Sequence, residues 1–492
     1  MKLPARSLPA TAPYFRFRKL EDDVFLVTND IGRYAFLAED ELQDLLDGEI
    51  VHGHERFAEL AEKGFVQGGM SADEQVRIIA RRNSHLFTGT NLHIMIVTLR
   101  CDHRCVYCHA SRAPMGTRGV DMKPETADKV LERAFETPAR QVTIEFQGGE
   151  PLVNLRVIKR VVENAWKLAE EKDKELVLTL VSNLSMLDRE TADYLADNGV
   201  FVCTSLDGPK ELHDMNRPLP GGSSHDSVLA GMEVMNDAYR KRDLDPRMYK
   251  VNALLTVTRA SLDRPEEIVD EYVRLGLNTL HARPLNPFGM ASRAAGISYD
   301  ADEYLAFYKR VLARVMEHAL NGVDIQERTA ALHLTKILTD REPNYMELRS
   351  PCGAGLGQLA YDFDGSVYTC DEGRMLARTG DDLFKVGHVQ DDEYRDLAGS
   401  PVVKALAAAS CVEALPGCAD CAYALFCGVC PVYNYAQQGE LVARQPENQR
   451  CKIQMGVLDE LFSRLQNADQ DTLSIFERWT RPLPGQGEGG ST

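Results

Sequence analysis

Three cysteines lie within eight residues of one another, and their spacing is Cys101-x3-Cys105-x2-Cys108. Thiolates this close together can bind three irons of a four-iron cluster and leave the fourth iron open to another ligand. A zinc ion is the alternative, because zinc also binds sulfur-rich sites and takes four ligands. His103 or His109 could supply the fourth ligand of such a zinc ion. The spacing therefore predicts a metal centre.

Glycines and polar residues follow the next apolar segments of the chain. The first of these groups is Gln147-Gly148-Gly149-Glu150-Pro151, in which the glycines let backbone approach a ligand closely. The carboxylate of Glu150 can bind an ammonium group. The later segments end near Ser182, Asn183, Ser205, Asp207 and Arg217. Each of these polar side chains could instead cap a helix or fix a turn.

A second group of cysteines lies in the last third of the chain. The cysteines outside the first motif are Cys203, Cys352, Cys370, Cys411, Cys418, Cys421, Cys427, Cys430 and Cys451. Zinc ribbons also use Cys-x2-Cys pairs, so structural zinc sites are an alternative to iron–sulfur clusters here. Cys203 lies on an expected buried strand and is interpreted as a small apolar residue.

The composition limits the classes of function. The chain has 492 residues, which suggests two or three domains, and its net charge of −18 argues against a nucleic-acid partner and an anionic membrane. The N-terminus lacks the apolar core of a signal peptide, and the apolar stretch at 93–99 is far shorter than a membrane span. We therefore expect a cytoplasmic protein whose twelve cysteines bind metal rather than form disulfides.

Apolar segments that predict strands alternate with helical patterns between residues 91 and 300. The strands are expected at 93–99, 141–147, 176–182, 200–206, 251–257 and 278–283. The helices are expected at 124–136, 154–171, 188–198, 226–241 and 265–274. Apolar strands joined by helices predict a parallel sheet, and six such units predict an α/β fold with a partial (β/α)6 TIM-like barrel. The polar groups above would then gather at the carboxyl ends of the strands.

Residues 1–70 are expected to form a separate winged-helix-like module. Segments 25–27 and 34–37 predict a hairpin, and the first helix after it ends at Gly48. The remaining divisions are expected to be a linker at 71–90, the barrel at 91–300, a helical bridge at 301–350 that starts with an amphipathic helix over 301–320, a cysteine-rich iron–sulfur domain at 351–470 and a tail at 471–492.

With these motifs, residues 91–290 resemble the core of the radical S-adenosylmethionine (SAM) superfamily, whose cysteine spacing the first motif matches. The resemblance implies a [4Fe-4S] cluster on three cysteines, with SAM on its open iron. The residues that it implies in SAM binding are Tyr107 beside the adenine, Gly148, Gly149 and Glu150 at the methionyl amino group, Ser182 and Ser205 near the ribose, Asn183 and Asp207 at the same strand ends, and Arg217 at the carboxylate.

The C-terminal cysteines resemble the SPASM extension of radical SAM enzymes, which carries two auxiliary clusters. That pattern implies one cluster on Cys418, Cys421, Cys427 and Cys451, and an inner cluster on Cys352, Cys370 and Cys430. Two residues separate the last cysteine pair here, where three are usual. Cys411 could complete the inner cluster or leave it open. The resemblance therefore implies three [4Fe-4S] clusters.

More narrowly, segments 146–152, 283–287 and 426–435 resemble the peptide maturases of His-Xaa-Ser systems. This resemblance implies that the N-terminal module binds a precursor peptide by strand addition. It also implies hydrogen abstraction from the peptide by a 5′-deoxyadenosyl radical, followed by cross-linking or oxidation. A reductase with flavodoxin or ferredoxin would donate the electron.

Asp371, next to Cys370, is a candidate base for the proton that oxidation releases. The other interpretation of Asp371 is a solvated acidic loop that it shares with Glu372. A base in this place also suits the sulfatase-maturing relatives, which form formylglycine. A zinc-stabilised scaffold that binds peptides without catalysis is the alternative from a different class.

Overall fold

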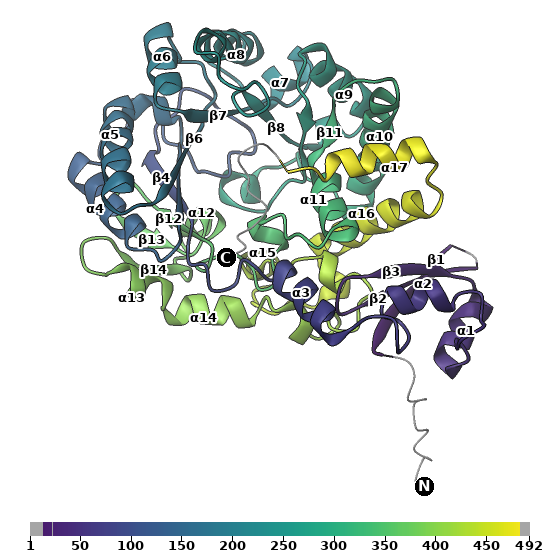
Figure 1. Ribbon diagram of the computed structural model, residues 1–492. Helices are drawn as coiled ribbons and strands as arrows, with labels where there is room; N and C mark the ends of the chain where they lie inside the picture. Colours follow the sequence, from purple (N-terminus) through teal and green to yellow (C-terminus); the bar gives the residue numbers. More distant parts are fainter. Residues whose placement is uncertain (1–12, 22, 483–492) are drawn as a thin grey trace.

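The computed structural model describes residues 13–21 and 23–482. Its N-terminal module begins with an antiparallel sheet of order β1-β2-β3 (Figure 1). The strands are β1 Phe15–Glu21, β2 Val24–Asn29 and β3 Tyr34–Leu37. The helices that follow are α1 Glu39–Asp47, α2 Phe57–Glu62 and α3 Ala72–Arg82. Part of the module expected over 1–70, residues 1–12, lies outside the described residues.

The local sequence explains most of this module. Leu42 and Leu45 lie on the buried face of α1, and Gly48 ends the helix in the left-handed conformation, as expected from the sequence. The hairpin is formed by β2 and β3, but the strand β1 was not predicted because polar and aromatic residues alternate along it without a buried apolar row. The linker expected over 71–90 contains the helix α3, which begins after the capping residue Ser71.

The barrel contains six parallel strands in the order β10-β8-β7-β6-β5-β4. They are β4 Leu92–Thr98, β5 Gln141–Gly148, β6 Glu175–Val181, β7 Val200–Ser205, β8 Asn252–Thr256 and β10 Ala282–Arg283. The helices beside them are α4 Pro124–Phe135, α5 Leu155–Glu171, α6 Arg189–Asp197, α7 Lys210–Asn216, α8 Ser224–Lys241 and α9 Pro265–Arg274. The predicted partial barrel is thereby confirmed, and only the short helix α7 was not expected.

The C-terminal half extends the barrel sheet. The strand β12 (Gln358–Tyr361) pairs in parallel with β4, and β13 (Ser366–Tyr368) and β14 (Lys385–His388) follow it in antiparallel pairs. The helices around this extension are α12 Asp371–Ala377, α13 Tyr394–Ala398, α14 Pro401–Ala408 and α15 Pro431–Gln438. The cysteine-rich region is therefore joined to the barrel through backbone hydrogen bonds along β4.

The helices of residues 301–338 and 449–479 lie together on the right of the view (Figure 1). A two-stranded sheet joins β9 (Thr279–Leu280) to β11 (Gln326–Glu327). The helices are α10 Ala301–Leu320, α11 Arg328–Leu338, α16 Gln449–Gln466 and α17 Gln470–Trp479. The apolar side chains expected along α10 are buried: Tyr304, Phe307, Tyr308, Val311, Leu312 and Val315.

The tail expected over 471–492 starts with an ordered helix, which corrects that expectation for its first part. Ile475, Phe476 and Trp479 fall on one face of α17 and are buried, which holds the segment against the protein. Residues 483–492 of the expected tail lie outside the described residues. Across the described part of the chain, the helices are too short or too polar to cross a membrane.

Candidate functional site

The loop with the first three cysteines follows β4 and is held by backbone hydrogen bonds from three other segments. The amide of Cys101 donates to the carbonyl of Ala113 (3.0 Å), and the amide of Val106 donates to that of Asn216 (2.9 Å). The amide of Met290 donates to the carbonyl of Cys108 (2.9 Å). These contacts fix both ends of the loop at the mouth of the barrel.

Two glycines at the end of β5 let the next loop pack against the cysteine loop. A Cβ atom on Gly148 would overlap the carbonyl oxygen of Thr98, and a Cβ atom on Gly149 would overlap those of Leu99 and Arg100. Gly148 also has a φ of 154°, which side chains disfavour. The structure therefore gives a steric reason for glycine at both positions.

Glu150 is fully buried behind these glycines. Its carboxylate accepts hydrogen bonds from the hydroxyl of Ser182 (2.8 Å), the amide of Leu152 (3.0 Å) and the amide of Asn183 (2.8 Å). Burial raises the pKa of Glu150 to about 7, against these hydrogen bonds, which lower it. The carboxyl group thus holds the ends of β5 and β6 together.

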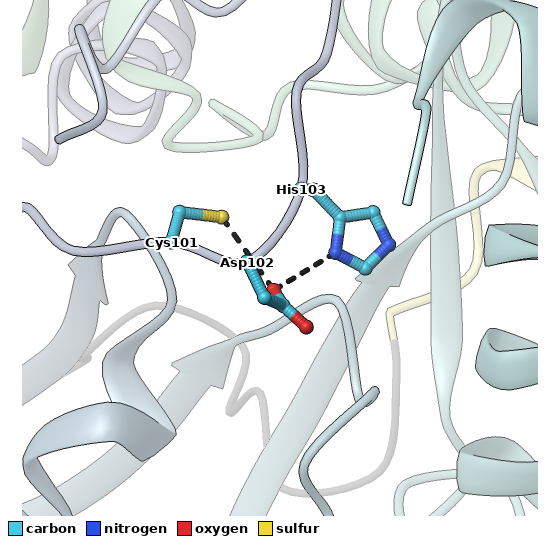
Figure 2. Close-up of side chains that lie close together, drawn as sticks. All are labelled: Cys101, Asp102 and His103. Carbon is cyan, nitrogen blue, oxygen red and sulfur yellow. Dashed lines mark hydrogen bonds and ion pairs between the residues drawn. The ribbon is translucent and has the colours of Figure 1, made fainter. Parts of the chain in front are cut away.

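A polar network lies beside Cys101 (Figure 2). Asp102 lies 2.9 Å from Nδ1 of His103 and accepts hydrogen bonds from Asn183 (2.9 Å) and Ser185 (2.5 Å). The thiol of Cys101 lies 3.8 Å from the same carboxylate. Cys101, Asp102 and His103 could together hold a small ion such as zinc, because one donor atom from each lies within 4.8 Å of the others.

A second network lies at the ends of β7 and α7. The hydroxyl of Tyr107 donates to Asp207 (2.6 Å), and Nε of Arg217 lies 3.1 Å from the same carboxylate oxygen. The guanidinium of Arg217 also lies 5.1 Å from the centre of the Tyr107 ring. Ser205 is the last residue of β7 and is partly exposed. The fold therefore brings the residues expected to bind SAM to the carboxyl ends of the neighbouring strands β4, β5, β6 and β7 and to the end of α7.

The thiols of the loop are suited to binding iron. Burial raises the pKa of Cys105 to about 11, with Arg217 lowering it and Cys108 raising it. Burial likewise raises the pKa of Cys101, to which Cys105 contributes. Thiols that are close enough to oppose each other's ionisation need a cationic partner to become thiolates. Three thiols from one loop fit a three-cysteine cluster with one open iron better than a closed four-ligand zinc site.

Three of the C-terminal cysteines share one buried group of side chains: Cys352, Cys370 and Cys430 are only 4%, 2% and 5% exposed. Cys370 and Cys430 each begin a helix, α12 and α15. Their sulfur atoms accept hydrogen bonds from the amides of Gly373 and Tyr433, both at 3.4 Å. Amide donors at a helix start favour a thiolate.

Four further cysteines gather nearby at the start of α16. The pKa of Cys418 is raised to about 12 by burial and then by the charges of Cys427, Cys451 and Cys421. Cys411 differs from them, because its thiol lies 3.5 Å from the carboxylate of Glu413. Cys352, Cys370 and Cys430 thus share one buried group of side chains, and the assignment of these cysteines to two clusters stays a prediction.

Charged residues line the interior of the barrel between the two cysteine regions. Arg450 pairs with Glu347 (2.8 Å), Arg283 lies 3.6 Å from the same carboxylate, and these three residues line one cavity. Glu145 of β5 faces the interior as well, on the side opposite the buried Ile144 and Phe146. Burial, and then the charge of Glu145, raise the pKa of Cys203 of β7.

Sequence reasoning did not identify these interior charges. The sequence signal for Glu145 was the alternation along β5, where Val142, Ile144 and Phe146 are buried and the residues between them are polar. Asp371, the expected base, is bonded to Nε of the buried Arg374 at 2.8 Å. For Arg374 we find no local sequence signal, because its position depends on how α12 packs.

Comparison with known proteins identifies the barrel. Residues 95–244 match the family model of the Radical SAM superfamily. The chain is 25% identical to a cysteine-type anaerobic sulfatase-maturating enzyme of Clostridium perfringens over 308 residues. This aligned region covers 60% of this chain and 76% of that protein.

Solved structures share the fold. The enzyme anSMEcpe, solved with AdoMet and a peptide, has a TM-score of 0.64 at 22% identity, over 77% of this chain and 98% of that chain. SuiB of Streptococcus suis bound to its precursor peptide SuiA has a TM-score of 0.51 at 13% identity, over 88% and 98%. The family match implies one [4Fe-4S] cluster and SAM, and it favours an enzyme over the non-catalytic zinc scaffold.

Proposed function

Because this chain is a radical SAM enzyme with a cysteine-rich C-terminal region, we propose that it modifies a ribosomally made peptide. The peptide would be cross-linked or oxidised after hydrogen abstraction. The likeness to SuiB, which was solved with a precursor peptide, and to anSMEcpe, which was solved with a peptide, supports this substrate class.

The observation that carries the proposal is a buried carboxylate beside the cysteines of the inner group. Asp371 directly follows Cys370, is only 8% exposed and accepts a hydrogen bond from Nε of the buried Arg374 (2.8 Å). A carboxylate at this place would be available to take up a proton next to the inner group.

The first cysteine loop would hold a reduced cluster with SAM, which would supply hydrogen-atom abstraction by a 5′-deoxyadenosyl radical. The chain's own residues would orient the peptide and manage the proton. Asp371 would accept the proton that the peptide loses on oxidation, and the C-terminal cysteines would hold the cluster that takes up the accompanying electron. Arg374 holds Asp371 in place through Nε.

We also propose which cysteines bind the auxiliary clusters and in which cellular compartment the protein works. Cys352, Cys370 and Cys430 would bind an inner auxiliary cluster with an open iron, because Cys411 turns toward Glu413. Cys418, Cys421, Cys427 and Cys451 would bind the outer one. A reductase with a flavodoxin or ferredoxin would supply electrons in the cytoplasm, where thiols stay reduced.

The N-terminal module is the proposed binding site for the precursor peptide. Within the described residues, β1 and β3 each pair on one side only. The carbonyl of Phe36 in β3 already accepts a hydrogen bond from Arg56, and Phe36 packs against Phe462 of α16. The edge of β1 is more open, with Phe17 half exposed, so we propose that the peptide adds a strand to β1.

The test is co-expression with the short peptides encoded beside the gene, followed by mass spectrometry. We expect one peptide to lose hydrogen in the presence of the wild-type enzyme. Asp371→Asn should still form 5′-deoxyadenosine but leave the peptide unoxidised, whereas Asp391→Asn, at a surface carboxylate, should act like wild type. Loss of 5′-deoxyadenosine formation in Asp371→Asn alone would contradict the role of Asp371 as a base.

Formylglycine formation on a sulfatase is the second candidate, and the likeness to the Clostridium perfringens enzyme favours it. The product distinguishes the two functions. Formylglycine carries an aldehyde that reacts with a hydrazide probe, whereas a cross-linked or desaturated peptide does not react. Incubation of the reduced enzyme with a peptide carrying a sulfatase-type cysteine would give an aldehyde only in the second case.

A further inference from the structure

A hollow opens to solvent beside the first cysteine loop. Its volume is about 440 Å³, and Cys101, Arg104, Arg112, Met115 and Leu219 are among the residues that line it. Its walls therefore come from the start of the cysteine loop, from the segment that returns after this loop and from the segment that precedes α8.

Backbone hydrogen bonds hold these walls in place. The amide of Cys101 donates to the carbonyl of Ala113 (3.0 Å), and the amide of Ala113 donates to that of Leu99 (2.6 Å). The returning segment therefore lies along the end of β4. The amide of Arg104 donates to the carbonyl of Pro218 (2.8 Å), which joins the cysteine loop to the third wall. The hollow is thus a fixed part of the fold.

Two arginines in the walls carry charge that is not neutralised locally. Arg104 is exposed, and Nε of Arg112 is buried without a hydrogen-bond partner. Within the described residues neither arginine forms an ion pair, whereas the nearby Arg100 pairs with Asp121 at 2.8 Å. Asp102 also lines the hollow, but its carboxylate already accepts hydrogen bonds from other side chains. The hollow is therefore positively charged.

This positive site lies on a protein whose net charge is −18. An acidic protein is repelled by most of such a surface and is attracted to the few places where positive charge collects. Apolar residues surround the arginines, since Met115 is 37% exposed and Pro114 and Pro220 are exposed beside it. Arginine and methionine among apolar side chains are typical of protein–protein interfaces. The charge and the apolar rim together favour an acidic protein partner.

Cys101 indicates what such a partner would do. It is only 8% exposed, yet it lines the hollow, so a partner seated there would contact the first cysteine loop itself. In the described part of the chain, none of the residues expected to bind SAM lines the hollow, so SAM on those residues would leave it free. The position suits a protein that delivers electrons to this loop.

We propose that this hollow is the docking site of a flavodoxin, a small acidic protein that carries electrons on a flavin. A concave site favours flavodoxin over ferredoxin, because the edge of a flavin can enter it. One electron leaves the flavin hydroquinone, which is oxidised to the semiquinone, and reduces the cluster of the first cysteine loop by one electron. No atom is transferred. The inference rests on the proposed function, which needs a reduced cluster.

The test is the binding of oxidised flavodoxin to the iron-loaded double variant Arg104→Gln/Arg112→Gln. We expect the dissociation constant to rise about tenfold at low salt, because two exposed charge pairs are lost, and the difference to shrink at high salt. Isothermal titration calorimetry measures both effects. Arg77→Gln/Arg395→Gln removes the same charge from two other exposed arginines and should bind as the wild type does. Equal affinities in the two double variants would overturn the docking site.

Reduction separates docking from the chemistry. At limiting concentrations, flavodoxin hydroquinone should reduce Arg104→Gln/Arg112→Gln about tenfold more slowly than the wild type, whereas titanium(III) citrate should reduce both equally. Equal slowing with both reductants would indicate a structural role and overturn the proposal, as would similar binding of a ferredoxin in place of flavodoxin. Absence of 5′-deoxyadenosine with titanium(III) citrate in the wild type would instead contradict the proposed function.

A lysine pair covers the case in which the glutamine variant does not fold. Arg104→Lys/Arg112→Lys keeps both charges and adds two primary amines, which a carbodiimide couples to the carboxylates of bound flavodoxin. Mass spectrometry should find these cross-links at positions 104 and 112. Arg77→Lys/Arg395→Lys is the control and should give none at its own positions. Cross-links that are absent from positions 104 and 112, or equally frequent in the control, would overturn the proposal.

Discussion

The two cysteine regions are assembled in opposite ways. At the barrel mouth, Cys101, Cys105 and Cys108 come from one loop, and neighbouring segments hold that loop through its backbone. In the C-terminal region the inner group combines Cys352 with Cys370 and Cys430, which are far apart in the sequence. The first site is local and depends on a few backbone contacts. The second forms only when several segments have folded around it.

This difference has consequences for stability and reactivity. A local loop can lose its cluster while the barrel persists, because its ligands are not structural links between segments. Clusters that join distant segments act as cross-links, so their binding free energy contributes to folding. Variants at the two sites should therefore separate catalysis from stability.

The largest effect is expected from Cys105→Ala. We expect the protein to fold, to lose about four irons per chain, and to form no 5′-deoxyadenosine above background when mixed with reductant and SAM. Iron analysis and chromatography of the nucleoside measure both changes. Cys203→Ala, at a barrel cysteine outside the two groups, should keep its iron. A Cys105 variant with full iron content would show that the loop does not bind the cluster.

Cys421→Ala should have the next largest effect, on stability. It removes a member of the group of four, so we expect loss of about four irons and a clearly lower thermal midpoint, while some cleavage of SAM remains. Cys411→Ala is the matched variant, because its thiol faces Glu413 and should not bind iron. Iron loss in Cys411→Ala equal to that in Cys421→Ala would show that Cys411 is also a ligand.

The same contrast explains what could be predicted from the sequence. The first motif was recognisable because its three ligands lie within one loop, and the expected barrel strands and helices match because their apolar periodicity is strong. The grouping of Cys352 with Cys370 and Cys430 needed the resemblance to a known pattern, since no local signal joins residues so far apart.

Features that depend on tertiary packing were missed. The pairing of β12 with β4 joins the C-terminal region to the barrel, and short strands of this kind have weak local signals. The strand β1 is an edge strand with polar residues, and α3 lies in a segment whose composition resembles a linker. Arg374 is an extreme case, because a charged residue in a short helix is usually exposed.

A smaller effect is expected from Gly149→Ala, which tests how closely the two loops at the barrel mouth pack. The added Cβ would overlap the carbonyl oxygens of Leu99 and Arg100, so the cysteine loop must move. We expect destabilisation of about 1–3 kcal/mol and SAM binding weakened about tenfold. Gly116→Ala has open space around it and should be nearly neutral. Equal SAM affinity in both variants would contradict close packing of these loops.

The smallest effect is a pH dependence that comes from a buried carboxyl group at the barrel mouth. Burial raises the pKa of Glu150 from about 4.5 to about 7, so the folded chain holds this proton more tightly than the unfolded chain. The contribution of this bound proton to the free energy of unfolding is fully present below about pH 4.5. It is lost as the pH rises through about 7. Glu150→Gln lacks this titration.

The thermal midpoint of the SAM-free wild type should therefore fall relative to that of Glu150→Gln as the pH rises from about 5 to about 8. We expect a relative loss on the order of 2 kcal/mol, because one pKa unit corresponds to about 1.4 kcal/mol and a small part of the loss has already occurred at pH 5. Differential scanning calorimetry at several pH values measures the difference. A difference that stays constant with pH would mean that Glu150 remains charged in the folded protein, held by Ser182 and the amide of Asn183 alone.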